Sequence, residues 1–214
     1  MPVSVALAWA LTGALAVVDW WAVARRRPAV ERWAKPAVML GLLLVAVALG
    51  AGDTTVGRWT LAALVLGLVG DVFLLEDSQA RFVGGLAAFL VGHIAWVAAF
   101  LAAGLTAPAL GWVGVGVVAV ALLLGRRILP GANREGGPAL AVPVAVYMAV
   151  IAAMAVTGWA TGHLAVGLGA SLFVVSDTVL ALGRFDRERP WTPVTVIVTY
   201  HLAQALLVAG LLSG

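Results

Sequence analysis

The sequence has no cysteine and few charged residues: Asp, Glu, Lys and Arg make up only 11% of its 214 residues. The lack of cysteine excludes a disulfide framework, thiolate catalysis and cysteine-ligated metals. The scarcity of charge accompanies a hydrophobic content of 63% and a mean hydropathy of +1.08. No soluble domain of this size needs so much apolar surface, so the composition predicts an integral membrane protein. The net charge of +3 then reflects basic loops at a membrane face, and we expect no nucleic-acid partner.

Long apolar segments follow one another along the chain without the alternation of membrane β-strands, so we expect an all-α, polytopic fold. A spanning helix needs about 20 mostly apolar residues. Eight segments qualify: Val3–Ala24, Pro36–Ala51, Trp59–Leu75, Phe82–Ala103, Ala109–Gly125, Pro138–Thr157, His163–Leu182 and Thr192–Leu212. No basic stretch precedes the first segment, so we expect a retained helix rather than a cleaved signal. The sequence therefore predicts a single eight-helix transmembrane domain over residues 1–214.

The basic residues predict the orientation of this domain in the membrane. Of the 13 Lys and Arg residues, all but Arg58 fall in the first, third, fifth and seventh predicted loops. Because cytoplasmic loops carry an excess of Lys and Arg, we expect these loops in the cytoplasm and both termini outside. The abundance of Ala, Gly, Val and Arg is typical of a GC-rich bacterium, so the expected location is the bacterial inner (cytoplasmic) membrane.

The two halves of the chain share a pattern of polar and proline residues. Four residues recur at offsets of 102 to 108 positions: Pro28 as Pro130, Pro36 as Pro138, Asp71 as Asp177 and His93 as His201. This predicts a parallel 4+4 internal repeat with halves 1–104 and 105–214, related by an axis along the membrane normal. The alternative is coincidence among helices of similar composition.

Asp71 and Asp177 interrupt segments that otherwise read as spanning helices. A charged side chain at membrane depth costs about 2.5–3.5 kcal/mol on insertion scales, so it is seldom kept without a use. At 1.5 Å per residue, both lie about 6–9 Å from the cytoplasmic helix ends. Two neighbouring carboxyls can divide into a protonated acid and an ionised partner, which suits acid–base catalysis. The structural alternative is an interhelical hydrogen bond or an ion pair with a nearby arginine.

Other polar residues share these depths. Lys35, before Pro36 at the cytoplasmic mouth of the second segment, is either a snorkelling anchor or a clamp for a lipid phosphate. His93 is either a hydrogen bonder in the bundle interior or part of the site. Tyr200 and Gln204 lie four residues apart on one helical face, as expected beside a polar cavity. Close-spaced ligand pairs are missing, so we expect neither a metal nor another cofactor.

At these residues the chain resembles the YhhN-like lysoplasmalogenase family of eight-helix membrane proteins. The resemblance is carried by five features: Lys35-Pro36, Gly70-Asp71, His93, the segment from Gly169 to Ser176-Asp177, and Tyr200 with Gln204. It implies hydrolysis of the vinyl-ether bond of lysoplasmalogens, lysoplasmenyl-ethanolamine or -choline, to a fatty aldehyde and a glycerophospho-alcohol. The chemistry suits paired carboxyls, because it begins with protonation of carbon and passes through an oxocarbenium ion.

The resemblance also suggests a role for each candidate residue. Asp71 and Asp177 are expected to be catalytic, as the acid and its carboxylate partner in an order left open. Five residues are expected to bind substrate: Lys35, His93, Ser176, Tyr200 and Gln204. The expected partners are a lysophospholipid substrate and membrane lipids, and no protein partner is indicated. The alternative function is a small transporter or lipid-binding protein with a polar pocket open to the cytoplasm.

Overall fold

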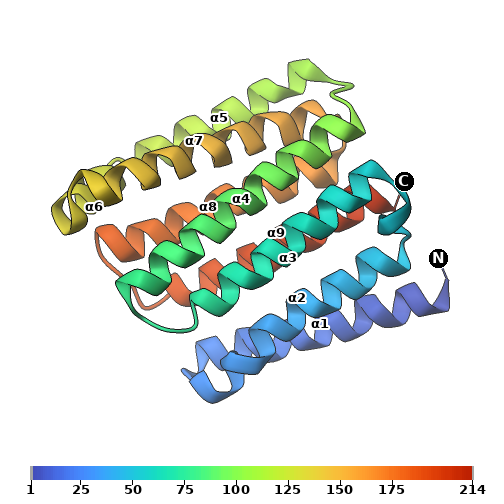
Figure 1. Cartoon of the computed structure of the whole chain (residues 1–214), viewed down its shortest axis with the longest axis horizontal. Coiled ribbons are helices and arrows are strands. Elements are labelled where there is room, and N and C mark those ends of the chain that lie inside the picture. Colours follow the sequence, from blue (N-terminus) through green and yellow to red (C-terminus); the bar gives the residue numbers. More distant parts are fainter. Residues whose placement is uncertain (1, 214) are drawn as a thin grey trace.

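Residues 2–213 are described by a computed structural model, and in this part of the chain they form nine α-helices and two short 3₁₀ turns, with no β-strand. The helices are α1 (Val3–Ala24), α2 (Pro28–Ala48), α3 (Thr55–Phe73), α4 (Gln79–Ala103), α5 (Gly111–Leu124), α6 (Ile128–Gly136), α7 (Pro138–Ala160), α8 (Leu164–Phe185) and α9 (Thr192–Leu212). All except the short α6 run along one common direction (Figure 1). The predicted all-α class is confirmed.

Helix length and apolarity make the chain an integral membrane protein. Six helices are long and apolar enough to cross a bilayer: α1, α3, α4, α7, α8 and α9. The segment Pro108–Leu124 together with α6 makes a seventh candidate, although the two parts are bent by 53°. Helix α2 has 21 residues but carries Glu31, Arg32 and Lys35 in its first half. The predicted count of eight spans is therefore not reached by length and composition alone.

The predicted start of the second apolar helix, Pro36, was wrong. Helix α2 begins at Pro28 and continues through Pro36, which lies inside it. A proline suits the first turn of a helix, where its missing N–H is not needed, and Pro28 already fills that role. Lys35 therefore lies about two turns inside α2 rather than at its mouth.

The predicted loop after residue 125 contains a helix, α6. Its residues Ile128 and Ala132 are four apart, and both are buried. They share one helical face, which packs in a small apolar cluster with Leu140, Val144 and Phe185. The charged residues Arg134 and Glu135 on the other side made the segment read as a loop.

Glycine shapes the connections at one end of the molecule, where both termini also lie (Figure 1). Gly50, Gly104 and Gly162 follow α2, α4 and α7, and each has a positive φ, of 78°, 94° and 81°. Only glycine adopts such backbone angles without strain, so each of these helices ends sharply. The basic connections lie at the opposite end (Figure 1).

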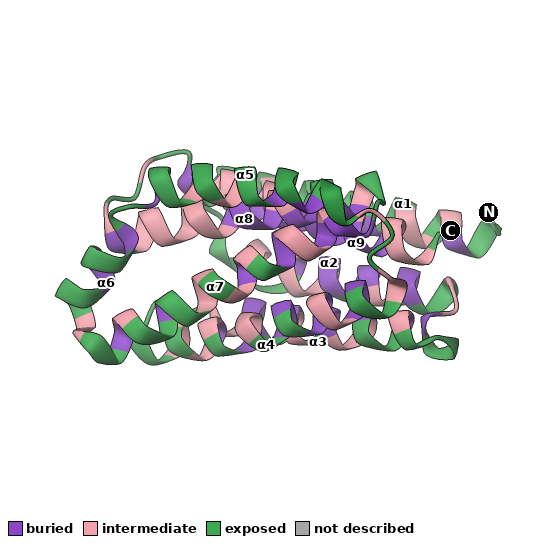
Figure 2. Ribbon diagram, turned by 90° about the horizontal axis from the view of Figure 1, so that it is seen from above, coloured by how far each residue is buried: buried purple, intermediate pink, exposed green. Residues whose placement is uncertain are grey.

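The helices α3, α4, α8 and α9 form the centre of the bundle, with α1 and α2 on one flank and α5 to α7 on the other (Figure 1). Buried residues line their inner faces (Figure 2), and Trp96, Phe100 and Phe173 are among the largest fully buried side chains. Outward-facing apolar side chains such as Leu7 and Leu44 are exposed, as a lipid-facing surface requires. Because lipid is as apolar as leucine, close packing at small residues holds such helices together.

Gly114 of α5 provides a test of this packing. A Cβ atom on Gly114 would lie 2.6 Å from the carbonyl oxygen of Ala155 and 2.7 Å from the Cα of Val156, both in α7. We expect Gly114→Ala to push the two helices apart and to lower the free energy of unfolding by about 1–3 kcal/mol.

The matched control is Gly116→Ala on the same helix, where an added Cβ meets no atom within 4 Å. It should leave stability unchanged or raise it slightly, because alanine favours helix over glycine. Thermal unfolding in detergent measures both variants. Equal midpoints for the two would contradict the close contact between α5 and α7.

Candidate functional site

Two polar clusters lie within the central helices, each around one of the two aspartates. The first, the Asp71 cluster, joins three helices. Asp71 of α3 accepts a hydrogen bond of 2.9 Å from the hydroxyl of Tyr200 in α9. Its other oxygen lies 3.6 Å from the ammonium nitrogen of Lys35 in α2. Gln204, one turn after Tyr200, donates to the tyrosine oxygen over 3.3 Å. The predicted grouping of Lys35, Tyr200 and Gln204 with Asp71 is thus present.

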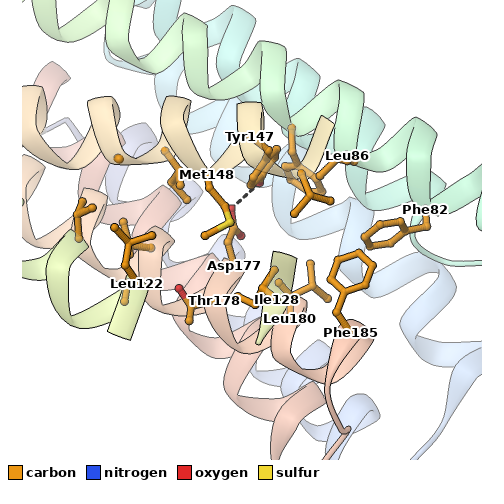
Figure 3. Close-up of a pocket in the computed structure, with 18 of the residues that line it drawn as sticks. Phe82, Leu86, Leu122, Ile128, Tyr147, Met148, Asp177, Thr178, Leu180 and Phe185 are labelled. Atoms are coloured by element: carbon orange, nitrogen blue, oxygen red, sulfur yellow. Dashed lines mark hydrogen bonds between the residues drawn. The ribbon is translucent and has the colours of Figure 1, made fainter. Parts of the chain in front are cut away.

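The second, the Asp177 cluster, also joins three helices. Asp177 of α8 accepts a hydrogen bond of 2.5 Å from the hydroxyl of Tyr147 in α7 (Figure 3). The same carboxylate oxygen lies 3.6 Å from Nε2 of His93 in α4. His93 and Asp177 are therefore neighbours, although 84 positions separate them in the chain.

The backbone of α4 fixes the protonation pattern of His93. Its Nδ1 lies 2.6 Å from the carbonyl oxygen of Phe89. A carbonyl only accepts, so Nδ1 must carry the proton, and Nε2 of the neutral ring presents its lone pair. Within the described chain Nε2 has no hydrogen-bond partner, and Asp177 is the carboxyl beside it. The pair can therefore share one proton between the carboxyl and the imidazole.

Aromatic packing links the two clusters. The ring of Phe173 lies 4.9 Å from that of His93 and 5.5 Å from that of Tyr200, in both cases edge to face. On the far side of Tyr200, Gly67 leaves room for the polar pair. A Cβ there would lie 2.9 Å from Nε2 of Gln204 and 3.1 Å from the Tyr200 hydroxyl. The clusters thus form one continuous packed unit with two separate carboxyl positions.

The two carboxyls differ in access. Asp177 lines a cavity of about 80 Å³, whose other walls are almost entirely apolar (Figure 3). Its side chain is 16% exposed, whereas that of Asp71 is only 2% exposed. A molecule that enters the cavity therefore meets Asp177 directly, while Asp71 stays behind Lys35 and Tyr200.

A polar pocket of about 440 Å³ adjoins this cavity. The two share the side chains of Leu74, Phe82 and Leu180. Charged groups of both signs line the polar pocket: the cations of Lys35 and Arg184, and the carboxylates of Glu31, Glu76, Asp77 and Glu188. An apolar cavity at the carboxyl thus lies beside a pocket of mixed charge at the basic end of the bundle.

Ser176, which the sequence also suggested, has a different partner. Its hydroxyl donates to the carbonyl oxygen of Val196 in α9 over 3.0 Å and so ties α8 to α9. Next to Tyr200, His201 accepts a hydrogen bond of 3.1 Å from the indole of Trp20. Asp19 is fully buried in α1, and neither of its carboxylate oxygens has a hydrogen-bond partner among the described residues.

Tyr147 was missed from the sequence. The chain contains only two tyrosines; one donates to Asp177 and the other to Asp71. Most tryptophans fall near predicted helix ends, as interfacial residues do, whereas Tyr147 lies in the middle of α7. A phenol in mid-membrane needs a hydrogen-bond partner, and that position was the available signal.

The donor set of the two clusters is that of acid–base chemistry: two carboxyls, two phenols, an imidazole, an amide and an ammonium group. Among the residues that the structure describes, no group of three or more His, Asp or Glu side chains is placed to hold a metal ion.

Comparison with known proteins gives one family and several relatives. Residues 30–211 match the model of the YhhN family. Lysoplasmalogenase TMEM86A of Bos taurus is 34% identical over 154 residues, which cover 67% of this chain and 61% of that protein. Lysoplasmalogenase TMEM86B of Homo sapiens is 35% identical over 150 residues, covering 68% of this chain and 59% of that protein.

A bacterial relative aligns over more of the chain. Lysoplasmalogenase of Mycobacterium tuberculosis is 30% identical over 179 residues, covering 82% of this chain and 68% of that protein. The aligned chain thus spans about three fifths of the two mammalian relatives. No solved structure matches the chain significantly.

The ion pair between Lys35 and Asp71 predicts how substitutions of these two residues change the free energy of unfolding. Removing one partner of a buried ion pair costs roughly 3–5 kcal/mol, because the other charge is left uncompensated. The Lys35 side chain keeps 12% exposure, so we expect Lys35→Met to fall at the lower end of that range. The double variant Lys35→Met/Asp71→Asn should recover most of the loss, because it removes both charges.

Arg58→Met serves as the control, since Arg58 is an exposed cation at the other end of the bundle. Thermal unfolding of the four proteins, including wild type, gives the comparison. A Lys35→Met variant as stable as Arg58→Met would mean that the lysine anchors to headgroups instead of pairing with Asp71.

Proposed function

The chain belongs to the YhhN family, and we propose that it is a membrane lysoplasmalogenase. It would hydrolyse the vinyl-ether bond of a lysoplasmalogen to a fatty aldehyde and a glycerophospho-alcohol. The observation that carries the proposal is the position of Asp177, whose carboxyl lines an apolar cavity next to a pocket of mixed charge.

The two adjoining spaces, one apolar and one charged, suit a single-chain zwitterionic lipid. Its phosphate would lie in the polar pocket near Lys35 and Arg184, and an amine of the headgroup would meet the carboxylates there. The vinyl ether, which adjoins the glycerol, would then lie at Asp177 among Phe82, Leu86 and Met148 (Figure 3). Exclusion of water at this position strengthens every electrostatic interaction with the reacting atoms.

Protonation of carbon would start the reaction. In its acid form Asp177 would give its proton to the β-carbon of the vinyl ether, whose π electrons form the new C–H bond. The α-carbon and the ether oxygen then share the positive charge of an oxocarbenium ion. Tyr147 donates to the Asp177 oxygen and would stabilise the carboxylate that results. The free Nε2 of His93 lies next to this oxygen; it would later accept a proton from water and pass it back to Asp177.

Addition of water completes the reaction. With His93 or the Asp177 carboxylate as base, water would attack the α-carbon and form a hemiacetal. Collapse of the hemiacetal forms the C=O bond of the aldehyde and breaks the bond to the glycerol oxygen. The hydroxyl proton is transferred to that oxygen through the carboxyl or the imidazole, and the alcohol leaves. Asp71 is paired with Lys35 and accepts a hydrogen bond from Tyr200. It would be the ionised carboxylate of the pair, with the Phe173 ring between its cluster and that of Asp177. At low dielectric its negative charge favours the oxocarbenium ion without contact.

Ser176 and Gln204 would hold other residues of this site in place. Gln204 holds the Tyr200 hydroxyl, and the bond from Ser176 to α9 fixes the neighbouring Asp177 on its helix. Both remain candidates for the substrate-binding role that the resemblance implies.

We also propose the eight-span topology with halves 1–104 and 105–214. The contacts of the two aspartates support the repeat. Asp71 on the third predicted span meets Tyr200 on the eighth and Lys35 in α2, the helix that contains most of the second. Asp177 on the seventh meets residues of the sixth and fourth. Exchange of the two halves converts one pattern into the other, as a twofold axis would require.

The basic end of the bundle would face the cytoplasm of a bacterium with the protein in its inner membrane, and both termini would lie outside. The polar pocket with Lys35 and Arg184 would then open at the cytoplasmic headgroup level.

This orientation predicts the accessibility of engineered cysteines, since the chain has none. Gly52→Cys, in the turn between α2 and α3, should react with a membrane-impermeant maleimide in intact spheroplasts. Asn133→Cys in α6 should react only after the membrane is opened. Both positions are exposed. The reverse pattern of labelling would overturn the proposed orientation.

Activity tests the function directly. Purified protein should release fatty aldehyde from lysoplasmenyl-ethanolamine, and Asp177→Asn should lower the rate by about 10²–10⁴-fold, the usual contribution of a general acid. Asp71→Asn should also lower the rate while the protein stays folded. Asp53→Asn, an exposed aspartate at the other end, is the matched control. Full activity in Asp177→Asn would refute Asp177 as the acid, and no aldehyde from wild type would refute the function.

A further inference from the structure

A lipid-facing groove of about 1010 Å³ runs between α5 and α8 and is not explained by the headgroup and bond positions described above. At the basic end it is bounded by Arg126, Arg189 and Trp191. Deeper in the bundle its walls are apolar or small, with Gly116 and Val117 opposite Ser171.

The groove meets the Asp177 cavity at a common wall. Ala121 of α5 and Val174 and Thr178 of α8 line both spaces. Thr178 directly follows Asp177, and Thr178 and Leu122 lie to one side of its carboxyl in Figure 3, with Phe82 and Phe185 on the other. Phe82 is shared with the polar pocket. The Asp177 cavity therefore lies between the charged pocket and the lipid-facing groove and shares wall side chains with each.

We propose that the groove between α5 and α8 holds the hydrocarbon chain of the lysolipid and releases the chain-bearing product sideways into the bilayer. This deepens the proposed function and rests on it for the identity of the reaction, but not for the binding of the chain.

Exposure of the groove walls supports a chain rather than a polar ligand. Val120 is 57% exposed and Val175 is 42% exposed on the outer surface of the bundle, where a bilayer supplies the surrounding apolar phase. A chain that starts at Asp177 would pass Ala121 and run toward Val117 and Ser171, away from the basic end. With the headgroup at the basic end, this direction leads toward the middle of the membrane, as a lipid tail requires.

The two products would then leave by different routes. The glycerophospho-alcohol is polar and matches the charged pocket around Lys35 and Arg184. The fatty aldehyde is apolar and matches the groove. Each product would therefore leave the Asp177 cavity along a surface of its own polarity.

Photocrosslinking locates the chain without relying on catalysis. An ether lysophosphoethanolamine with a diazirine at the end of its chain is bound to the wild-type protein in nanodiscs and irradiated, and labelled peptides are mapped by mass spectrometry. We expect labels on the deeper groove wall, around Val117, Val120 and Val175, that excess unlabelled lysolipid competes away. Equal labelling by a photoreactive diacyl lipid, without competition, would reduce the groove to ordinary lipid contact and overturn the proposal.

Chain length provides the functional test. Ala121→Phe places a ring in the common wall, so cleavage of a substrate with a sixteen-carbon alkenyl chain should fall by about tenfold or more relative to one with a four-carbon chain. The matched control is Ala119→Phe, on the exposed face of the same helix, which should leave that ratio unchanged. The crosslinks should also be lost in Ala121→Phe and retained in Ala119→Phe.

The outcomes separate the two proposals. Wild type that binds the chain in the groove but releases no aldehyde would refute the proposed function and leave the groove assignment in place. Suppose instead that the wild-type protein cleaves both substrates. Crosslinks outside the groove, or an unchanged chain-length ratio in Ala121→Phe, would then overturn the groove assignment alone.

Discussion

Two carboxyl groups, those of Asp71 and Asp177, need hydrogen-bond donors inside a bundle that offers almost no water. The rest of the structure depends on how these donors are supplied. Hydrocarbon supplies no hydrogen bonds, so Asp71 and Asp177 draw their donors from neighbouring helices. Asp71 draws on α2 and α9, and Asp177 draws on α4 and α7. These contacts fix the rotation of six central and flanking helices about their axes, and the small residues between them allow the approach that the bonds require.

The unequal partners of the two carboxyls explain how similar positions can have different chemical roles. Asp71 faces a lysine and is screened from the cavity, so it is suited to remain a carboxylate. Asp177 faces a phenol and an imidazole and is open to the cavity, so it is suited to exchange a proton. The surrounding spaces follow the same division, since charged side chains collect beside Lys35 and apolar ones beside Asp177. An amphiphilic molecule is the natural occupant of such a gradient.

Much of this was accessible from the sequence. Unbroken apolar runs predicted the long helices, and the cost of charge in hydrocarbon singled out Asp71, Asp177 and the polar residues of α9. Pairing across distant helices was not accessible, because nothing in an isolated segment tells which neighbour an apolar helix will pack against. Tyr147 was missed for that reason. The start of α2 was misjudged because Pro36 was read as a helix start, and α6 was missed because its charged face outweighed the four-residue spacing of Ile128 and Ala132.

Both tyrosines of the chain are bonded to the two carboxyls, and this has a spectroscopic consequence. In most proteins tyrosine signals are spread over the whole fold, whereas here each of the two phenols is bonded to one of these carboxyls. Uniform fluorotyrosine labelling would give two ¹⁹F resonances, one for each carboxyl, without any cysteine chemistry or further mutation. Each proton transfer at one aspartate could then be followed separately from events at the other.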